Sequence, residues 1–150
     1  MSRVVIGGDR SIPGSDPATV WALVADPSRL AEWTPLVVVG YMGRELPDAG
    51  AVFFAKGRRR RPDREALRYE YVEWVAGRSY RCAMPDGVLG QERELEVRVH
   101  AVLEDDGAHT TVQLIHRAEV ARWGAAAYRV LATRRIRRAL EAILRAGSGP

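Results

Sequence analysis

The sequence predicts an α+β protein in which about seven antiparallel strands form one strongly curved sheet around a long C-terminal helix. Three observations lead to this fold class. Short apolar segments, many of them alternating, follow one another with Gly, Pro and Asp turns between them, as antiparallel strands do. Two short helical segments come after the first strand. The last long segment, residues 122–146, carries apolar residues three and four positions apart, which is typical of a helix with one buried face.

The strands are predicted from apolar alternation and from the turn residues that separate them. Gly7 and Gly8 weaken the first strand, because glycine has no side chain to pack. Turns are expected at residues 47–50, 76–77 and 105–107, where glycine offers the conformations that tight turns need. The predicted strands cover residues 4–12, 36–42, 51–59, 66–75, 78–84, 91–103 and 109–120.

The two short helices have recognisable start and stop signals. Asp16 can cap the first helix, and Pro17 suits its first position, where a missing N–H costs no hydrogen bond. This helix is expected to end near Asp26, since the residue before a proline avoids helical angles. The second short helix is predicted at residues 27–32.

The final helix, residues 122–146, is roughly 37 Å long if each residue adds about 1.5 Å. Gly147 predicts its end, and Arg145 lies in the last turn, where the helix dipole favours a cation. Its start has no capping side chain and contains Gly124. The predicted apolar stripe consists of Trp123, Ala127, Val130, Leu131, Ile136, Leu140, Ile143 and Leu144.

Length and composition indicate one domain, residues 1–150. Apolar residues make up 47% and charged residues 28% of the chain, as in an ordinary soluble protein. No apolar run is long enough for a membrane span, the first nine residues lack the apolar core of a signal peptide, and Cys82 has no second cysteine to pair with. We therefore expect a cytoplasmic protein. The net charge of +4 is mixed along the chain and does not predict nucleic-acid binding.

The sequence contains no pattern for metal, nucleotide or covalent chemistry. Its three histidines and one cysteine are scattered, so they predict no metal site. There is no Gly-rich phosphate loop and no Gly-x-Ser-x-Gly nucleophile turn. We therefore expect no metal and no cofactor.

Residues 20–35, with the sequence VWALVADPSRLAEWTP, closely resemble the opening of the SRPBCC superfamily, which includes polyketide cyclases/dehydrases, START-like and birch-pollen-allergen-like proteins. Further segments resemble this superfamily in the same order: Gly50–Phe53, Tyr71–Trp74 and Asp106–Val112. The resemblance covers nearly the whole chain. It implies a single SRPBCC/START-like domain with a helix-grip fold, whose strands wrap around the C-terminal helix and leave a cavity between. It also implies a ligand, since members bind lipids, polyketides, plant metabolites or quinones, and some cyclise or dehydrate polyketides.

Strand parity makes His116 the first candidate for catalysis. It shares one face of the last strand with the apolar Val112 and Leu114, so this face should look at the helix or the cavity. A histidine, with a reference pKa of about 6.5, can act there as a general acid or base. The alternative is a hydrogen-bonded core histidine without a catalytic role.

The strand at residues 66–75 leaves two orientations open. The superfamily resemblance places Val72 and Trp74 toward the cavity. Arg68 and Glu70 would then line it, as a pair that could bind an oxyanion or move a proton. Hydrophobicity alone favours the other face, on which Tyr71 is a further candidate for proton transfer. That face carries Leu67, Tyr69, Tyr71 and Val75.

The other site candidates are apolar residues that would form either the cavity wall or ordinary core. They are Trp33, Tyr41, Phe53, Trp74, Val112, Leu114, Ala127, Val130 and Leu131.

Charged residues are expected on outer faces. Glu94, Glu96 and Arg98 alternate with apolar residues and predict solvent-facing pairs across strands. The arginine run 58–61 is interpreted as a solvated hairpin tip. Arginines of the final helix could bind anionic lipid or an acidic carrier protein, although a solvated face is the simpler interpretation. They are Arg134, Arg135, Arg137 and Arg138.

These observations and the resemblance together predict a cofactor-free protein that takes a small, largely apolar ligand or polyketide beneath the final helix, most simply as a polyketide cyclase or aromatase. The cavity would fold a flexible chain into a reactive pose while one or two polar groups move protons. The alternatives are a non-catalytic carrier or sensor of lipid or quinone, and a protein-interaction module. The protein is expected to be a monomer or a homodimer.

Overall fold

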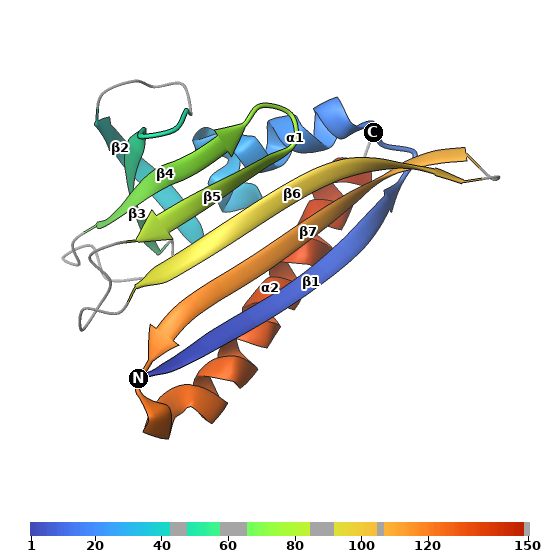
Figure 1. The fold of residues 1–150 in the computed structure, drawn as a ribbon. Helices are drawn as coiled ribbons and strands as arrows, with labels where there is room; N and C mark the ends of the chain where they lie inside the picture. The colour runs from blue at the N-terminus through green and yellow to red at the C-terminus, as the bar shows by residue number, and fades with distance from the viewer. Residues whose placement is uncertain (43–47, 58–65, 85–91, 105–106, 149–150) are drawn as a thin grey trace.

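In the described part of the chain, seven antiparallel strands form one sheet, and the helices lie on one side of it (Figure 1). The computed structural model describes residues 1–42, 48–57, 66–84, 92–104 and 107–148. The strand order is β1-β7-β6-β5-β4-β3-β2, so the first strand lies at an edge beside the last one. The strands are β1 (Ser2–Pro13), β2 (Leu36–Met42), β3 (Val52–Gly57), β4 (Leu67–Val75), β5 (Ser79–Met84), β6 (Arg93–Glu104) and β7 (Gly107–Val120).

The predicted strands and short helices are confirmed in number and order. Helix α1 (Pro17–Ala25) begins at Asp16, whose carboxylate accepts a hydrogen bond of 2.8 Å from the amide of Thr19. It is followed by the short 3-10 helix η1 (Pro27–Glu32). The arginine run 58–61 and residues 105–106 of a predicted turn lie outside the described residues.

The final helix begins later than predicted. A 3-10 turn, η3 (Arg122–Gly124), precedes helix α2 (Ala125–Ser148), and no side chain caps η3. Helix α2 crosses behind β7 and β1 (Figure 1). Among the described helices, none combines the length and the apolar composition that crossing a bilayer requires.

The predicted apolar stripe of α2 is wrong in its N-terminal half. Ile136, Leu140 and Ile143 face the sheet as expected and are buried. Continued toward the N-terminus in steps of three and four, their face passes through Ala132, Tyr128 and Ala125 and not through the larger aliphatic residues. Four residues of the predicted stripe therefore lie away from the sheet and are exposed: Trp123, Ala127, Val130 and Leu131.

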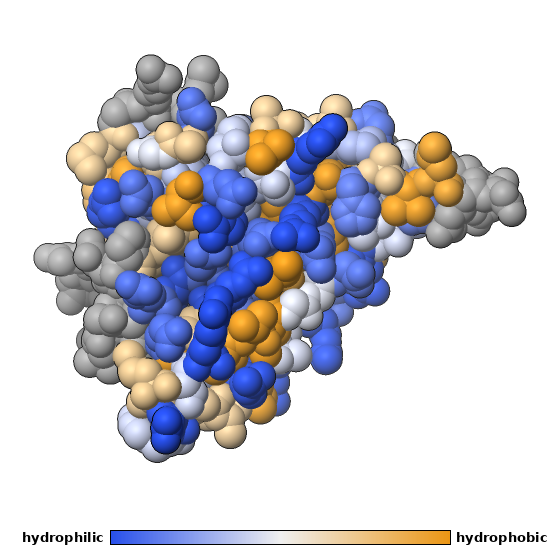
Figure 2. Space-filling model, viewed as in Figure 1, coloured by the Kyte–Doolittle hydropathy of each residue, from blue (hydrophilic) through white to orange (hydrophobic). Residues whose placement is uncertain are grey.

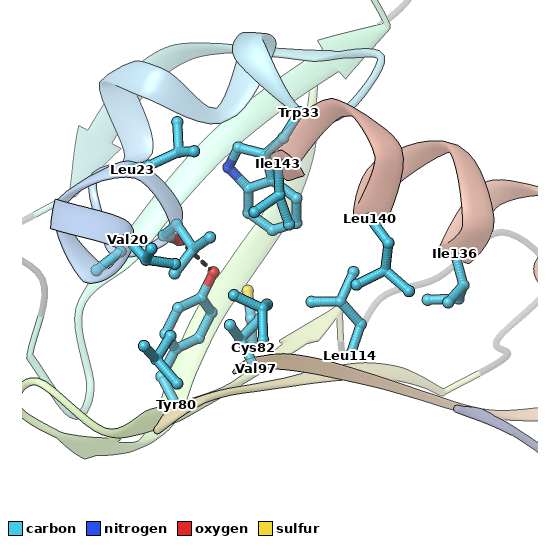
Figure 3. Close-up of a cluster of buried hydrophobic side chains, with 14 of the residues drawn as sticks. Val20, Leu23, Trp33, Tyr80, Cys82, Val97, Leu114, Ile136, Leu140 and Ile143 are labelled. Atoms are coloured by element: carbon cyan, nitrogen blue, oxygen red, sulfur yellow. Dashed lines mark hydrogen bonds between the residues drawn. The ribbon is translucent and has the colours of Figure 1, made fainter. Parts of the chain in front are cut away.

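The core is continuous between the helices and the inner face of the sheet. Figure 3 shows Trp33, Val20 and Leu23 facing Tyr80 and Cys82 on β5, with Leu114, Leu140 and Ile143 completing the cluster. The hydroxyl of Tyr80 donates a hydrogen bond of 2.6 Å to the carbonyl of Val24, near the end of α1. Cys82 is a buried hydrophobe, and burial raises the pKa of its thiol to about 12.

The outer face of the sheet carries a network of ion pairs, so the predicted outward direction of Glu94, Glu96 and Arg98 is confirmed. Glu96, predicted to face solvent, is instead buried within this network. Arg81 contacts Glu73 at 2.6 Å and Glu94 at 3.3 Å, which joins β4, β5 and β6. Further contacts link Glu94 and Glu96 to Arg117 on β7, and Glu96 to Arg98. Figure 2 shows hydrophilic side chains gathered over this part of the sheet.

Two hydroxyl groups fix the C-terminal end of α2 against the start of α1. The Ser15 hydroxyl donates to the carbonyl of Gly147 at 2.5 Å. The hydroxyl of Thr110 on β7 donates to the Ser15 carbonyl at 2.7 Å. The far end of α2 is therefore anchored to the sheet and to the β1–α1 connection.

Candidate functional site

His116 on β7 and Tyr128 on α2 form a polar pair between the sheet and the helix. The Nε2 atom of His116 lies 2.5 Å from the hydroxyl oxygen of Tyr128, and their rings are stacked with centroids 5.8 Å apart. His116 points inward because it has the parity of the buried Leu114 and Ala118. The predicted inward direction of His116 is therefore confirmed, and its partner on the helix is identified.

Two arginines place this pair in a positive field. The guanidinium carbon of Arg93, on β6, lies 5.9 Å from the centre of the Tyr128 ring. Burial, together with the charges of Arg93 and Arg135, lowers the pKa of His116 to about 4. Burial raises the pKa of Tyr128, and the same two arginines oppose that rise. Both members of the pair are therefore neutral at pH 7.

A neutral imidazole bonded to a neutral phenol is an arrangement that can pass a proton in either direction. The hydrogen bond between the two side chains is part-buried. An anion that formed beside it would be stabilised by the two guanidinium groups. The geometry thus suits chemistry in which a carbonyl compound passes through an enolate.

An apolar and aromatic surface continues from this pair across the inner face of the sheet. Phe53 stacks on Tyr69 at 5.1 Å between centroids, and Tyr71 lies 5.5 Å from Phe53. Trp33, at the end of η1, lies above this surface and is 2% exposed. Its indole Nε1 is buried and has no hydrogen-bond partner among the residues that the structure describes (Figure 3). Because a buried donor without a partner is unfavourable, this atom is a candidate hydrogen-bond donor to an oxygen atom of a ligand.

Strand β4 combines both orientations that the sequence left open. Its pairing with β5 shifts register between Tyr71 and Glu73. A shift of this kind changes which residues face inward. Tyr71 therefore packs inward, and Trp74 contacts its ring at 5.2 Å, while Val72 is 42% exposed.

The same strand corrects the prediction for Arg68 and Glu70. They alternate with the inward-facing Tyr69 and Tyr71, so they lie on the outer face. Arg68 Nη1 contacts Glu70 Oε2 at 3.8 Å, and both side chains are about one-third exposed. The pair therefore belongs to the outer surface and not to the predicted cavity.

The predicted wall residues divide into three groups. Trp33, Phe53, Val112 and Leu114 are buried in the core, and Trp74 packs against it. Tyr41 is 40% exposed on β2, although its cross-strand partner is the buried Phe53. Three of the proposed wall residues face away from the sheet, which contradicts their prediction: Ala127, Val130 and Leu131.

Two surface pockets lie away from the His116–Tyr128 pair. One, of about 490 Å³, lies where the β4–β5 turn and α1 meet β6. The other, of about 310 Å³, lies between β1 and α2 and is bordered by Gly8, Ile136 and Leu140. Neither pocket is bordered by His116 or Trp33.

Sequence reasoning missed Tyr128 and Arg93. Arg93 has the inward parity of Leu95 and Val97, so its inward direction could have been predicted from the sequence. Tyr128 is two turns from Ile136 on the same helix face. The sequence instead predicted Val130 and Leu131 on the buried face, because they are large and aliphatic. Within the part of the chain that the structure describes, no three His, Cys, Asp or Glu side chains gather as a metal site would require.

A long C-terminal helix packed on the inner face of seven curved antiparallel strands defines a helix-grip protein. Residues 7–146 match the family described as polyketide cyclase / dehydrase and lipid transport. The chain belongs to this family, within the SRPBCC superfamily predicted from the sequence. No curated protein matches the sequence significantly.

Solved structures with the same fold have very different sequences. Truncated norcoclaurine synthase from Thalictrum flavum superposes with a TM-score of 0.70 at 11% identity, over 97% of this chain and 93% of that one. A protein from Thermobifida fusca gives 0.69 at 19% identity, over 96% and 91%. A protein from Nitrosospira multiformis gives 0.68 at 13% identity, over 97% of each. At such identities the likeness shows the fold alone.

Proposed function

We propose that the protein binds a small, largely apolar carbonyl compound beneath α2 and catalyses its enolisation and ring closure without a cofactor, as a polyketide cyclase or aromatase does. The observation that carries this proposal is the 2.5 Å contact between His116 Nε2 and the Tyr128 hydroxyl in the field of two arginines. The family to which the chain belongs supports the ligand class.

The proposed reaction begins with two coupled proton transfers. Tyr128 passes its proton to Nε2 of His116 while its oxygen takes a proton from the carbon beside a ligand carbonyl. The enolate that results lies near Arg93 and Arg135. Its negative charge offsets the repulsion that otherwise keeps His116 neutral, so the imidazolium exists only while the enolate does. The enolate carbon then attacks a second carbonyl, and Tyr128 returns a proton to the new alkoxide as His116 reprotonates Tyr128.

The test uses phenylacetone in deuterated water, because deuterium uptake beside its carbonyl reports enolisation without knowledge of the natural ligand. NMR spectroscopy should show uptake faster than in buffer. The variants Tyr128→Phe and His116→Gln should each slow the catalysed uptake by about a hundredfold or more. The matched control is His100→Gln, since His100 is exposed on β6 and should leave the rate unchanged. Equal rates of deuterium uptake in the unmodified protein and the three variants would contradict a catalytic role for His116 and Tyr128.

The second candidate is a non-catalytic carrier of an apolar molecule with one oxygen acceptor. It is favoured by the buried Nε1 of Trp33, which has no hydrogen-bond partner within the described ranges and lies among largely aromatic side chains. A carrier would bind phenylacetone, as seen by saturation-transfer NMR, and would not accelerate deuterium uptake. Trp33→Phe should then weaken binding by about tenfold through loss of one hydrogen bond.

A further inference from the structure

The outward side of the first half of α2 is apolar. Trp123 in η3 is 93% exposed, and Val130 and Leu131 are each 53% exposed. Their spacing places them on one side, opposite the buried Ala132. We call this surface the Trp123 face. It comprises Trp123, Ala126, Ala127, Val130 and Leu131, all of them exposed. A helix that is apolar on both sides normally has a partner on both sides, and the sheet covers only one here.

Basic residues surround the Trp123 face. The exposed Arg134, Arg137 and Arg138 continue the same side of α2 toward its C-terminus. Between residues 121 and 140 the sequence has six arginines and no acidic residue. The N-terminus of the chain lies beside the N-terminal end of α2 (Figure 1), and Met1 is 68% exposed. The outward side of α2 thus combines exposed apolar side chains with concentrated positive charge.

We propose that the Trp123 face docks the protein on the surface of a membrane that contains anionic lipids. A second copy of the chain does not fit this face, because its arginine-rich surface would meet an equally positive one. A protein partner would need a pocket shaped for the protruding Trp123. A bilayer interface needs no such pocket, since indole rings settle among the headgroups and arginines pair with lipid phosphates.

This docking goes beyond the proposed function and does not depend on it. The inner side of the same helical segment carries Tyr128, and its outer side carries Val130 and Leu131. Docking would therefore use side chains that take no part in the His116–Tyr128 pair, and a docking variant should keep its activity on phenylacetone.

The test measures co-sedimentation with vesicles of phosphatidylcholine, with or without about one-third phosphatidylglycerol. The protein should bind the anionic vesicles and leave the neutral ones, and raising the salt to about 0.5 M should release it. The double variant Arg134→Glu/Arg138→Glu should lower partitioning by at least twenty-five-fold, since each arginine contributes about fivefold at an anionic surface. Emission of Trp123 should shift to shorter wavelength on binding, and Trp123→Ala should abolish the shift.

Two control variants change exposed residues outside the Trp123 face. Leu103→Ser removes a side chain that is 84% exposed near the β6–β7 hairpin, and Arg78→Glu reverses an exposed charge beside the β4–β5 turn. Both should bind vesicles as the unmodified protein does. Unshifted Trp123 emission, or equal binding by the Arg134→Glu/Arg138→Glu variant, would overturn the proposal. Retention on immobilised polyglutamate without vesicle binding would also overturn it, in favour of an acidic protein partner.

Discussion

Gly8 on β1 lies so close to Leu140 on α2 that a Cβ atom at Gly8 would be 3.0 Å from the Leu140 Cδ1 atom. It would also lie 3.1 Å from Ile136 Cγ2. The glycine therefore weakens the strand locally but lets the helix approach the sheet. This contact helps to place the helix that carries Tyr128.

We predict that Gly8→Val destabilises the protein by about 2 kcal/mol, because the added methyl groups would push α2 away from β1. Urea unfolding followed by circular dichroism measures this change. Gly7→Val is the matched control, since the nearest atom to a Cβ at Gly7 is a backbone oxygen at 3.7 Å, an ordinary contact. The control should change stability by less than about 1 kcal/mol. Equal losses in the two variants would show that backbone effects, and not the helix contact, explain Gly8.

The existence and order of the elements could be predicted because each depends on neighbouring residues. Asp16 and Pro17 start α1 through local capping, and alternation identifies β6 and β7. Which face of a long helix is buried cannot be predicted from neighbouring residues in the same way. In the first half of α2 the aliphatic Val130 and Leu131 lie outside while the small Ala132 lies inside, which reverses the usual pattern. Only the packing of the whole sheet decides which side is covered.

The site was predictable in part for the same reason. His116 could be placed inward from the parity of one regular strand. The direction of Arg68 and Glu70 depended on where β4 shifts its register against β5, and no single residue in the sequence indicates that position. The partnership of His116 with Tyr128 joins two elements, so local sequence could not show it.

The hydrogen bond from the Tyr80 hydroxyl to the Val24 carbonyl joins β5 to α1 inside the core. We predict that Tyr80→Phe lowers the free energy of unfolding by about 1–2 kcal/mol, since it leaves a buried carbonyl without this donor. The ring contacts of Tyr80 with Trp21 and Trp74 remain in the variant. Thermal unfolding would show a lower Tm with little change in the near-ultraviolet spectrum. An unchanged Tm would mean that water replaces the hydroxyl without loss.

Glu96 and Glu73 belong to the same outer network but differ in exposure. The Glu96 side chain is 7% exposed and contacts two arginines, whereas that of Glu73 is 53% exposed and contacts Arg81. We predict that Glu96→Gln destabilises the protein by about 1–2 kcal/mol and Glu73→Gln by less than about 0.5 kcal/mol. Urea unfolding at low and high salt measures both. A larger loss for Glu73→Gln would contradict the assignment of the stronger contacts to Glu96.

His116 predicts a loss of stability in mild acid. Burial and the charges of Arg93 and Arg135 lower its pKa from 6.5 to about 4 in the folded protein. Between these values the unfolded chain binds a proton that the folded protein does not, so stability falls as the pH drops from about 6.5 to about 4, by about 3 kcal/mol. His116→Gln removes this proton uptake, and its free energy of unfolding should change much less over the same range. His100→Gln, at an exposed position, should follow the unmodified protein. Parallel pH profiles for all three proteins would show that His116 titrates normally and is not held neutral beside Tyr128.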